Sequence, residues 1–223
     1  MKTPDYLICN IAVACLGGSA ASGQLRWVKA VLTGFVLTCF ALQFSVVQAQ
    51  DYVHLGVADG LPNGHVQSFA QDCQGYVWMS TEGGLARYDG FRFTVFEEHG
   101  SGLSSNELNT VLADPSGDGL FIATQRDGLC YYHPRENRFD VWREKDGLLY
   151  DGITHLVAAG DGGIWMCYYL GGMSHRAPDG TLTHFRPDDI PELAAFNWTI
   201  ATDGRGTLYL GHTNSLQCRC WYR

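Results

Sequence analysis

The sequence predicts an all-β fold made of repeated four-stranded units. A short apolar segment with an aromatic residue near its start occurs four times, and the aromatic anchors Trp78, Phe121, Trp165 and Tyr209 are 43, 44 and 44 residues apart. Helical periodicity is almost absent after residue 50. A fixed period of about 40–45 residues is typical of β-propeller blades, each of which is a small antiparallel sheet. We therefore predict a partial β-propeller of four-stranded antiparallel blades, with three complete blades and an incomplete fourth.

Other short motifs recur with about the same period as the aromatic anchors. A Gly-Leu pair opens the units at residues 60, 102 and 147, and a second glycine-containing pair follows each anchor by six or seven residues. These landmarks place the blades at about residues 60–101, 102–146, 147–189 and, incomplete, 190–223. An ordinary β-sandwich is the alternative, and the constant period argues against it.

Four strands can be assigned in the first unit, because short runs rich in β-branched and aromatic residues are bounded there by Gly or Asp. They are Val66–Ala70, Val77–Thr81, Leu85–Tyr88 and Phe93–Phe96. The dipeptide Asp89-Gly90 favours a two-residue hairpin in which both central residues have positive φ. We expect this tight hairpin between the third and fourth strands, and a similar one at Pro178-Asp179-Gly180 in the third unit.

The fourth unit departs from the pattern after Leu210. It ends in NSLQCRCWYR, where the earlier units predict a Gly-Leu strand and then a closing strand. We interpret this ending as a fragment, or as a change of reading frame near Asn214. The segment Pro191–Phe196, which has some helical character, is too short to bury a face by itself.

The first 49 residues are predicted to direct export. Basic residues precede the apolar run Ala30–Val47, and the small residues Val47 and Ala49 suit cleavage after Ala49. The run is 18 residues long, so an uncleaved signal-anchor helix is the alternative to a signal peptide. Residues 1–24 are unusually long for a leader, and we predict that they are a spurious extension. In either case the rest of the chain is expected to be periplasmic or extracellular, with the parent protein anchored in the inner membrane.

Residues 60–96 read GLPNGHVQSFAQDCQGYVWMSTEGGLARYDGFRFTVF. They combine a Gly-Leu-x-Asn opening, an Asp-x-x-Gly-x-hydrophobic-Trp strand, a Thr-x-x-Gly-Leu turn and a Tyr-Asp-Gly hairpin. In these motifs the chain resembles the two-component regulator propeller repeat. Residues 102–142 match less closely, with Phe121 in place of Trp, and residues 147–186 carry Tyr168 where Thr is usual. The resemblance covers about residues 55–212.

The resemblance implies that these blades are the extracytoplasmic input portion of a much longer sensor. In that family the output is usually a histidine kinase, often a hybrid kinase, and sometimes a diguanylate cyclase. Many members are associated with sensing carbohydrates or oligosaccharides. By this resemblance the chain itself is not an enzyme, and its partners are further propeller blades and an output domain of the same receptor. A homodimer is a further arrangement to consider.

Charge disfavours one class of partner. Residues 50–223 contain 12 basic and 22 acidic residues, which gives a formal net charge of −10. An acidic surface disfavours nucleic acid and anionic membranes as partners. We therefore expect a small-molecule or oligosaccharide ligand and no nucleic acid.

The sequence offers no pattern typical of catalysis or of a metal site. Five cysteines at non-repeating positions after residue 49 do not form a disulfide framework, and Cys130 and Cys167 are best explained as small buried apolar residues. His155 and His184 lie in predicted strands and are expected to be partly buried structural residues. The Asp- and Gly-rich turns lack the calcium-loop pattern and fit ordinary turn formation. We predict no catalytic residue, no metal and no cofactor.

Ligand binding is expected on the face where loops from successive blades meet. The loops that join blades on this face are 54–65, 97–107, 144–154 and 187–197, and the turns between second and third strands are 81–84, 124–128 and 168–172. Amide, charged and aromatic side chains suit sugar hydroxyls and ring faces. The candidate ligand contacts are Asn63, Glu82, Asn106, Arg126, Tyr150, Asp151 and Tyr169. For Asn63 and Asn106, a capping role in their own loops is the alternative.

Two other functions stay open from sequence. A secreted propeller enzyme, a lyase or a glycosidase, would direct paired carboxylates toward the central channel, and Glu82, Glu107 and Asp151 are the candidates. A protein-interaction scaffold would instead expose a large apolar patch. Because a short array leaves sheet edges exposed, residues 50–223 alone are expected to aggregate or to have low thermal stability.

Overall fold

The computed structural model describes residues 52–190, 193, 197–203, 206–212 and 215–220. The predicted signal peptide, most of the segment Pro191–Phe196 and the position near Asn214 lie outside these residues. Every described strand lies in the compact unit His54–Arg223.

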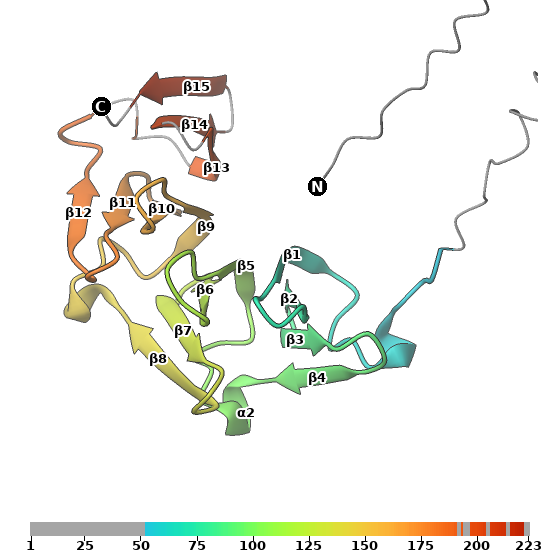
Figure 1. Cartoon of the computed structure of the whole chain (residues 1–223). Helices are drawn as coiled ribbons and strands as arrows, with labels where there is room; N and C mark the ends of the chain where they lie inside the picture. Colours follow the sequence, from blue (N-terminus) through green and yellow to red (C-terminus); the bar gives the residue numbers. More distant parts are fainter. Residues whose placement is uncertain (1–51, 191–192, 194–196, 204–205, 213–214, 221–223) are drawn as a thin grey trace, which may run out of the picture. The chain divides into compact units, whose positions relative to one another are not determined.

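The described strands form four antiparallel sheets that follow one another along the chain, which confirms the predicted all-β fold (Figure 1). Within each sheet every strand pairs with the next one in sequence. The first blade contains β1 (Val66–Gln71), β2 (Val77–Thr81), β3 (Gly84–Tyr88) and β4 (Phe93–Phe96). The second contains β5 (Leu108–Ala113), β6 (Leu120–Thr124), β7 (Leu129–His133) and β8 (Arg138–Trp142). The third contains β9 (Ile153–Ala158), β10 (Ile164–Tyr168), β11 (Met173–Arg176) and β12 (Leu182–Phe185), and the fourth contains three strands, β13 (Asn197–Thr202), β14 (Thr207–His212) and β15 (Ser215–Cys220).

Short helices precede three of the blades and explain the repeated Gly-Leu pair. They are η1 (Val57–Asp59), α2 (Glu98–Ser101) and η2 (Glu144–Asp146). Each ends at the glycine of the pair, whose φ is 107° at Gly60, 86° at Gly102 and 105° at Gly147. Glycine adopts this left-handed conformation without strain. The chain then reverses, and the leucine that follows is buried in all three cases. No helix in the described part of the chain is both long enough and apolar enough to cross a bilayer.

The predicted two-residue hairpin at Asp89-Gly90 is wrong. Tyr88 pairs with Phe93, so the loop between β3 and β4 is four residues long, and Gly90 alone among them has positive φ. The Asp89 carboxylate accepts the backbone amides of Phe91 and Arg92 at 2.9 and 2.8 Å. This local side-chain bonding stabilises a longer turn than the dipeptide preference suggests. In the third blade, the Ala177 amide donates to the carbonyl of Thr181 at 2.9 Å, so the tight turn lies at Pro178-Asp179-Gly180, as predicted.

Successive blades pack through two different faces. The forward face of a blade carries the anchor aromatic of its second strand, and the rear face carries the alternate side chains of the same strands. Trp78 on the forward face of the first blade packs on the second blade, with its ring centroid 5.2 Å from that of Tyr132. Phe121 and Trp165 pack in the same way on the third and fourth blades. Burial of each such side chain contributes about 1.5–3 kcal/mol to the free energy of folding. The buried apolar residues of the core lie mainly at these contacts between blades.

The first strands of successive blades lie side by side on the inner edge of the array (Figure 1). Side chains join them by hydrogen bonds to the neighbouring backbone. Asn109 Nδ2 donates to the carbonyl of Ile153 at 2.7 Å, and Thr110 Oγ1 donates to that of Thr154 at 3.3 Å. Polar residues on these strands therefore connect one blade to the next.

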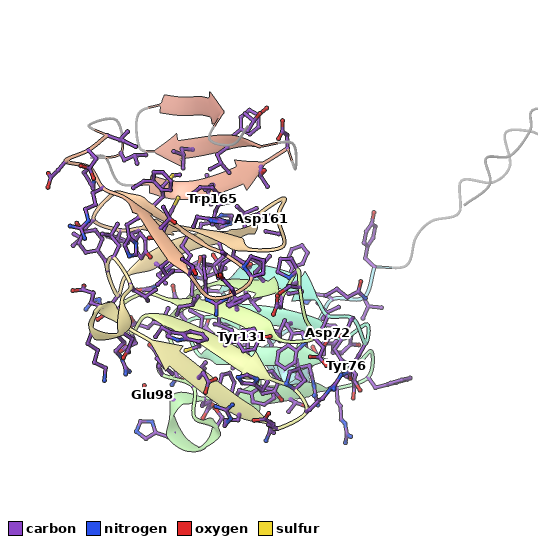
Figure 2. All side chains as sticks on the ribbon, turned by 60° about the vertical axis from the view of Figure 1, so that its left-hand side comes forward. Asp72, Tyr76, Glu98, Tyr131, Asp161 and Trp165 are labelled. Carbon is purple, nitrogen blue, oxygen red and sulfur yellow. The ribbon has the colours of Figure 1, made fainter. Side chains whose placement is uncertain are left out.

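Aspartates at the turn after the first strand connect the strands within a blade. Asp72 accepts the amide of Tyr76 at 3.0 Å and the indole N–H of Trp78 at 2.7 Å. Asp161 accepts the amide of Gly163 at 2.9 Å, and its other oxygen lies 3.1 Å from the buried His175 ring. Figure 2 shows Asp72 beside Tyr76 and Asp161 near Trp165. These contacts give the Asp-Gly turns a structural role, as the sequence predicted.

Candidate ligand-binding site

A cavity of about 380 Å³ lies where the second and third blades meet. It collects groups from the β6–β7 turn, from the loop that enters the third blade and from the β10–β11 turn. Four of the seven predicted ligand contacts line it: Arg126, Tyr150, Asp151 and Tyr169. The remaining lining residues are Gln125, Glu144, Gly152 and Leu170.

Backbone hydrogen bonds fix the three segments relative to each other. The Gly128 amide donates to the carbonyl of Asp151 at 2.9 Å, which connects the two blades across the cavity. The Tyr169 amide donates to the carbonyl of Gly152 at 3.0 Å. A Cβ at Gly152 would lie 3.0 Å from the carbonyl oxygen of Gln125, so the close approach favours glycine. Main-chain bonds thus connect the three segments of the lining.

Two acidic residues of the cavity lining bond to each other's backbone amides through their side-chain carboxylates. Asp151 Oδ1 accepts the amide of Glu144 at 2.7 Å, and Glu144 Oε1 accepts the amide of Asp151 at 3.3 Å. Each carboxylate uses one oxygen in this exchange. With Arg126, the lining therefore contains charged groups of both signs close to neutral amides and rings.

A buried tyrosine supports the aromatic part of the lining. Tyr168 is fully buried, and its ring meets that of Tyr150 edge to face at 5.8 Å between centroids. Burial raises the pKa of Tyr168 to about 12, so the phenol stays neutral at physiological pH. Beside it, Tyr169 is 43% exposed and Leu170 is 65% exposed. Tyr168 stands where the repeat usually has threonine, and its ring supports Tyr150 in the cavity lining.

A second cavity of about 280 Å³ shares Gln125 and Tyr169 with the first. Its other lining residues come from the first strands of three blades, and sequence reasoning missed them: Gln67, Asn109, Thr110, Thr154 and His155. A polar pair that recurs near the start of the first strand in the first three blades was the signal that could have identified them. The two cavities together offer an extended polar surface from the loops to the inner strands.

The other three predicted contacts lie outside both cavities. The side chains of Asn63 and Asn106 accept the backbone amides of His65 and Glu98 at 2.8 and 2.7 Å, which is the capping role given as their alternative. Glu82 is exposed and lies 2.8 Å from the ring of His65. The local bonds of these residues hold them in their own loops.

The carboxylates proposed for a glycosidase are not brought together by the cavities. Of Glu82, Glu107 and Asp151, only Asp151 lines one. Among the described residues, no group of three or more His, Cys, Asp or Glu side chains could hold a metal ion. Cys130 and Cys167 are free and buried inside strands, as expected.

Known proteins similar to this chain include sensor domains and lyases. No protein-family model matches the sequence. The curated virginiamycin B lyase of Nocardia farcinica (strain IFM 10152) is 30% identical over 119 residues, which is 51% of this chain and 41% of that protein. Among solved structures, the extracellular domain of a candidate hybrid two-component system from B. thetaiotaomicron matches 74% of this chain and 24% of that one, with 34% identity and a TM-score of 0.66. The virginiamycin B lyase of Staphylococcus aureus matches 72% of this chain and 57% of that one, with 12% identity and a TM-score of 0.56.

The chain therefore spans about a quarter of the sensor domain and about two fifths of the curated lyase. The sensor match agrees with the family that the repeat motifs indicated. The match to the S. aureus lyase shows a shared fold alone.

Proposed function

We propose that this chain is the ligand-sensing portion of an extracytoplasmic receptor, and that its ligand binds in the 380 Å³ cavity between the second and third blades. The observation that carries the proposal is the convergence of Arg126, Tyr150, Asp151 and Tyr169 from two blades. The volume lies within the range of about 300–1,000 Å³ that is usual for ligand pockets.

The lining favours a small polar ligand or an oligosaccharide. Tyr150 and Tyr169 offer ring faces with polar ends, and Gln125 adds both a donor and an acceptor. Arg126, Glu144 and Asp151 supply charge-assisted hydrogen bonds of both kinds. Hydroxyl groups, which donate and accept at one atom, match this mixture better than a purely apolar or purely anionic ligand does.

The similarity to the extracellular domain of a two-component system supports a sensing role and an extracytoplasmic location. We further propose that the whole receptor contains further blades, a membrane anchor and a kinase or cyclase output domain. Ligand binding would shift the receptor between two arrangements, and only a difference in affinity for those arrangements can drive the shift.

The test is calorimetric titration of the full chain against a panel of mono- and oligosaccharides. We expect saturable binding of at least one of them, and at least about a tenfold loss of affinity in Tyr169→Ala and Arg126→Ala, which corresponds to about 1.4 kcal/mol. Tyr52→Ala and Arg92→Ala are the matched controls, because both residues are exposed and lie outside the cavity. Binding that is absent, or that both cavity variants retain unchanged, would argue against this site.

A second candidate function is that of a lyase, which the 30% identity to the curated virginiamycin B lyase favours. Incubation of the full chain with virginiamycin B, followed by chromatography, separates the two candidates. The sensing proposal expects no turnover. Turnover that is lost in Glu144→Gln or Asp151→Asn would make the same cavity an active site.

A further inference from the structure

A β-bulge recurs at the same place in the first strand of every blade. The pairing between the first and second strands shifts register there by one residue in all four blades. The extra residue of the bulge is Gln67 in β1, Asn109 in β5 and Thr154 in β9. A bulge takes its extra residue out of the pairing and re-aims its side chain, and bulges are common beside functional sites. All three extra residues are polar.

These three bulge residues meet in the second cavity, whose volume is about 280 Å³. The strands that carry them lie side by side on the inner edge of the array (Figure 1). Because one equivalent position from each of three blades lines a common cavity, its polar lining arises from the repeat itself. The rest of the lining is Thr110, Gln125, His155 and Tyr169.

The second cavity has an uncharged lining that suits hydroxyl groups. Each of its side chains is an amide, a hydroxyl, a phenol or an imidazole. Burial lowers the pKa of His155, so the imidazole is neutral at pH 7. Thr110 Oγ1 donates its hydrogen to the carbonyl of Thr154 at 3.3 Å and therefore offers lone pairs to a ligand. Gln67 Nε2 lies 3.4 Å from Glu82 Oε1, which is longer than the usual ~2.7–3.2 Å.

The two cavities share a wall but differ in charge. Gln125 and Tyr169 line both of them. The first cavity adds Arg126, Glu144 and Asp151, which are charged. Tyr169 is 43% exposed, and its ring offers an apolar face to whatever passes between the cavities. A ligand that fills both cavities is therefore longer than one that fills the first alone.

We propose that the second cavity is a subsite for an uncharged, hydroxyl-rich unit of the ligand, which makes the ligand an oligosaccharide of at least two units. This inference rests on the proposed function, because the first unit binds in the 380 Å³ cavity. Gln67 and Asn109 bind hydroxyl groups of the second unit, and Tyr169 packs against the ligand between the two units. A monosaccharide occupies one cavity only, so the length of the sugar chain is part of the specificity.

The test is calorimetric titration of the full chain with three series of neutral sugars, those of maltose, cellobiose and mannobiose, each from the monosaccharide to the tetrasaccharide. We expect a di- or trisaccharide to bind about tenfold or more tightly than its own monosaccharide, which corresponds to about 1.4 kcal/mol. Because the second cavity is uncharged, this ratio should be the same at low and high salt. Equal affinities for all lengths would overturn the inference and leave the proposed function standing.

Gln67→Ala confines the change to the second cavity. Gln67 is exposed, so circular dichroism of this variant should remain that of the wild type. We expect about a fivefold loss of affinity for the longer sugars, the contribution of one hydrogen bond, and unchanged affinity for the monosaccharide. Arg126→Ala should instead weaken the binding of every length. Gln71→Ala is the matched control, because Gln71 is an exposed glutamine of the same strand outside both cavities.

The variants separate failure of the second subsite from failure of the whole site. A Gln67→Ala chain that binds every length as the wild type does, or that loses the same factor for the monosaccharide as for the longer sugars, would overturn the second subsite. Sensitivity to Arg126→Ala would still support the first cavity in that case. Absence of binding by every sugar of the three series would overturn the inference together with the proposed function.

Discussion

The Asp72 carboxylate accepts three hydrogen bonds within the first blade. It accepts two backbone amides of its turn, those of Gln74 and Tyr76, and also the indole N–H of Trp78, which is 1% exposed. A buried donor left without its acceptor costs about 1–3 kcal/mol. We expect Asp72→Ala to lower the free energy of unfolding by this amount, measured by urea denaturation with tryptophan fluorescence.

Asp89→Ala is the control for that measurement. The Asp89 carboxylate also accepts two backbone amides, from Phe91 and Arg92, but the turn it closes is exposed and no buried side chain depends on it. The Asp72 variant should therefore be clearly the less stable of the two. Equal stabilities would mean that the Trp78 bond contributes nothing beyond its turn.

Tyr168 is a residue whose replacement tests the support of the site. In the first two blades the equivalent Thr81 and Thr124 donate their hydroxyls to the carbonyls of Gly84 and Gly128 at 2.7 and 2.8 Å. A threonine in Tyr168→Thr could make the same hydrogen bond, which contributes about 1 kcal/mol to stability. The substitution also removes a buried ring, and replacing a buried aromatic residue by alanine costs about 3–5 kcal/mol. We expect a net loss of stability in urea denaturation.

The same variant should weaken ligand binding, because the ring of Tyr150 loses its edge-to-face neighbour. Titration of Tyr168→Thr, at a temperature where it remains folded, measures this effect. Unchanged affinity would show that Tyr150 is positioned by other contacts. Cys130→Ala is a matched core control, since Cys130 is buried in the second blade away from the cavity.

At the scale of the element, the turn between second and third strands requires glycine at its last position. Gly84, Gly128 and Gly172 have φ of 121°, 86° and 78°, and a Cβ at each would press on the end of the fourth strand. At Gly128 the obstacle is the carbonyl of Trp142. We expect Gly128→Ala to cost more than about 1 kcal/mol in thermal or urea unfolding. Gly64→Ala should have little effect, because its Cβ would meet nothing within 4 Å and its φ is not positive.

The blade elements were largely predictable because their signals are local. The predicted bounds of the strands at 77–81 and 93–96 are those observed, and the strands beginning near Val66 and Leu85 differ by one residue. The hairpin at Asp89 was not predictable from its dipeptide, since the side chain of Asp89 bonds two amides and lengthens the turn. Strand periodicity follows from side-chain alternation, whereas turn length depends on such individual bonds.

The candidate site was predictable only in its loop part. Arg126 and Tyr169 lie in turns whose common face follows from the repeat. Asn63 looked equivalent, but a bond to the amide of His65 holds it locally. Gln67 and His155 were treated as strand residues, and their place beside Tyr169 depends on how three blades pack together. Such packing is a long-range property that local sequence patterns do not contain.

The seam between the third and fourth blades should respond to pH. The Nδ1 atom of His155 lies 3.3 Å from the amide nitrogen of Ile200 and 3.1 Å from its carbonyl oxygen. Burial lowers the pKa of His155, against a smaller opposing effect of the Ile200 bond, and burial lowers the pKa of His184 as well. Since both histidines protonate more readily in the unfolded chain, their contribution is fully present above about pH 6.5 and is lost as pH falls toward their folded pKa values.

We therefore expect stability to fall between about pH 7 and pH 5, and His155→Gln to reduce this slope. The slope is measured by urea denaturation at a series of pH values. His99→Gln, at an exposed position in α2, is the control. An unchanged slope in His155→Gln would assign the pH dependence to other groups, with His184 as the next to replace.

At the scale of the whole molecule, the 380 Å³ cavity and the exposed apolar residues of the first blade lie in different places. The cavity needs only the second and third blades, whose contacts are complete within the described residues. The exposed apolar residues Phe69 and Val95 belong to the first blade. Ligand binding and the effect of this exposed apolar surface can therefore be tested by separate mutations, because Phe69 lies outside the cavity and Tyr169 lies outside the first blade.

The thermal transition should depend on protein concentration, because an exposed apolar sheet face favours aggregation of the heated chain. For the wild-type full chain we expect aggregation that increases with concentration. Phe69→Glu should reduce this aggregation, because it places a charge among the exposed apolar residues of the first blade. Calorimetry and light scattering over a wide concentration range measure the transition and the aggregation. A sharp transition above about 60 °C, higher than most mesophile domains, that is independent of concentration and unaffected by Phe69→Glu would mean that this exposed apolar surface does not drive aggregation of the heated chain.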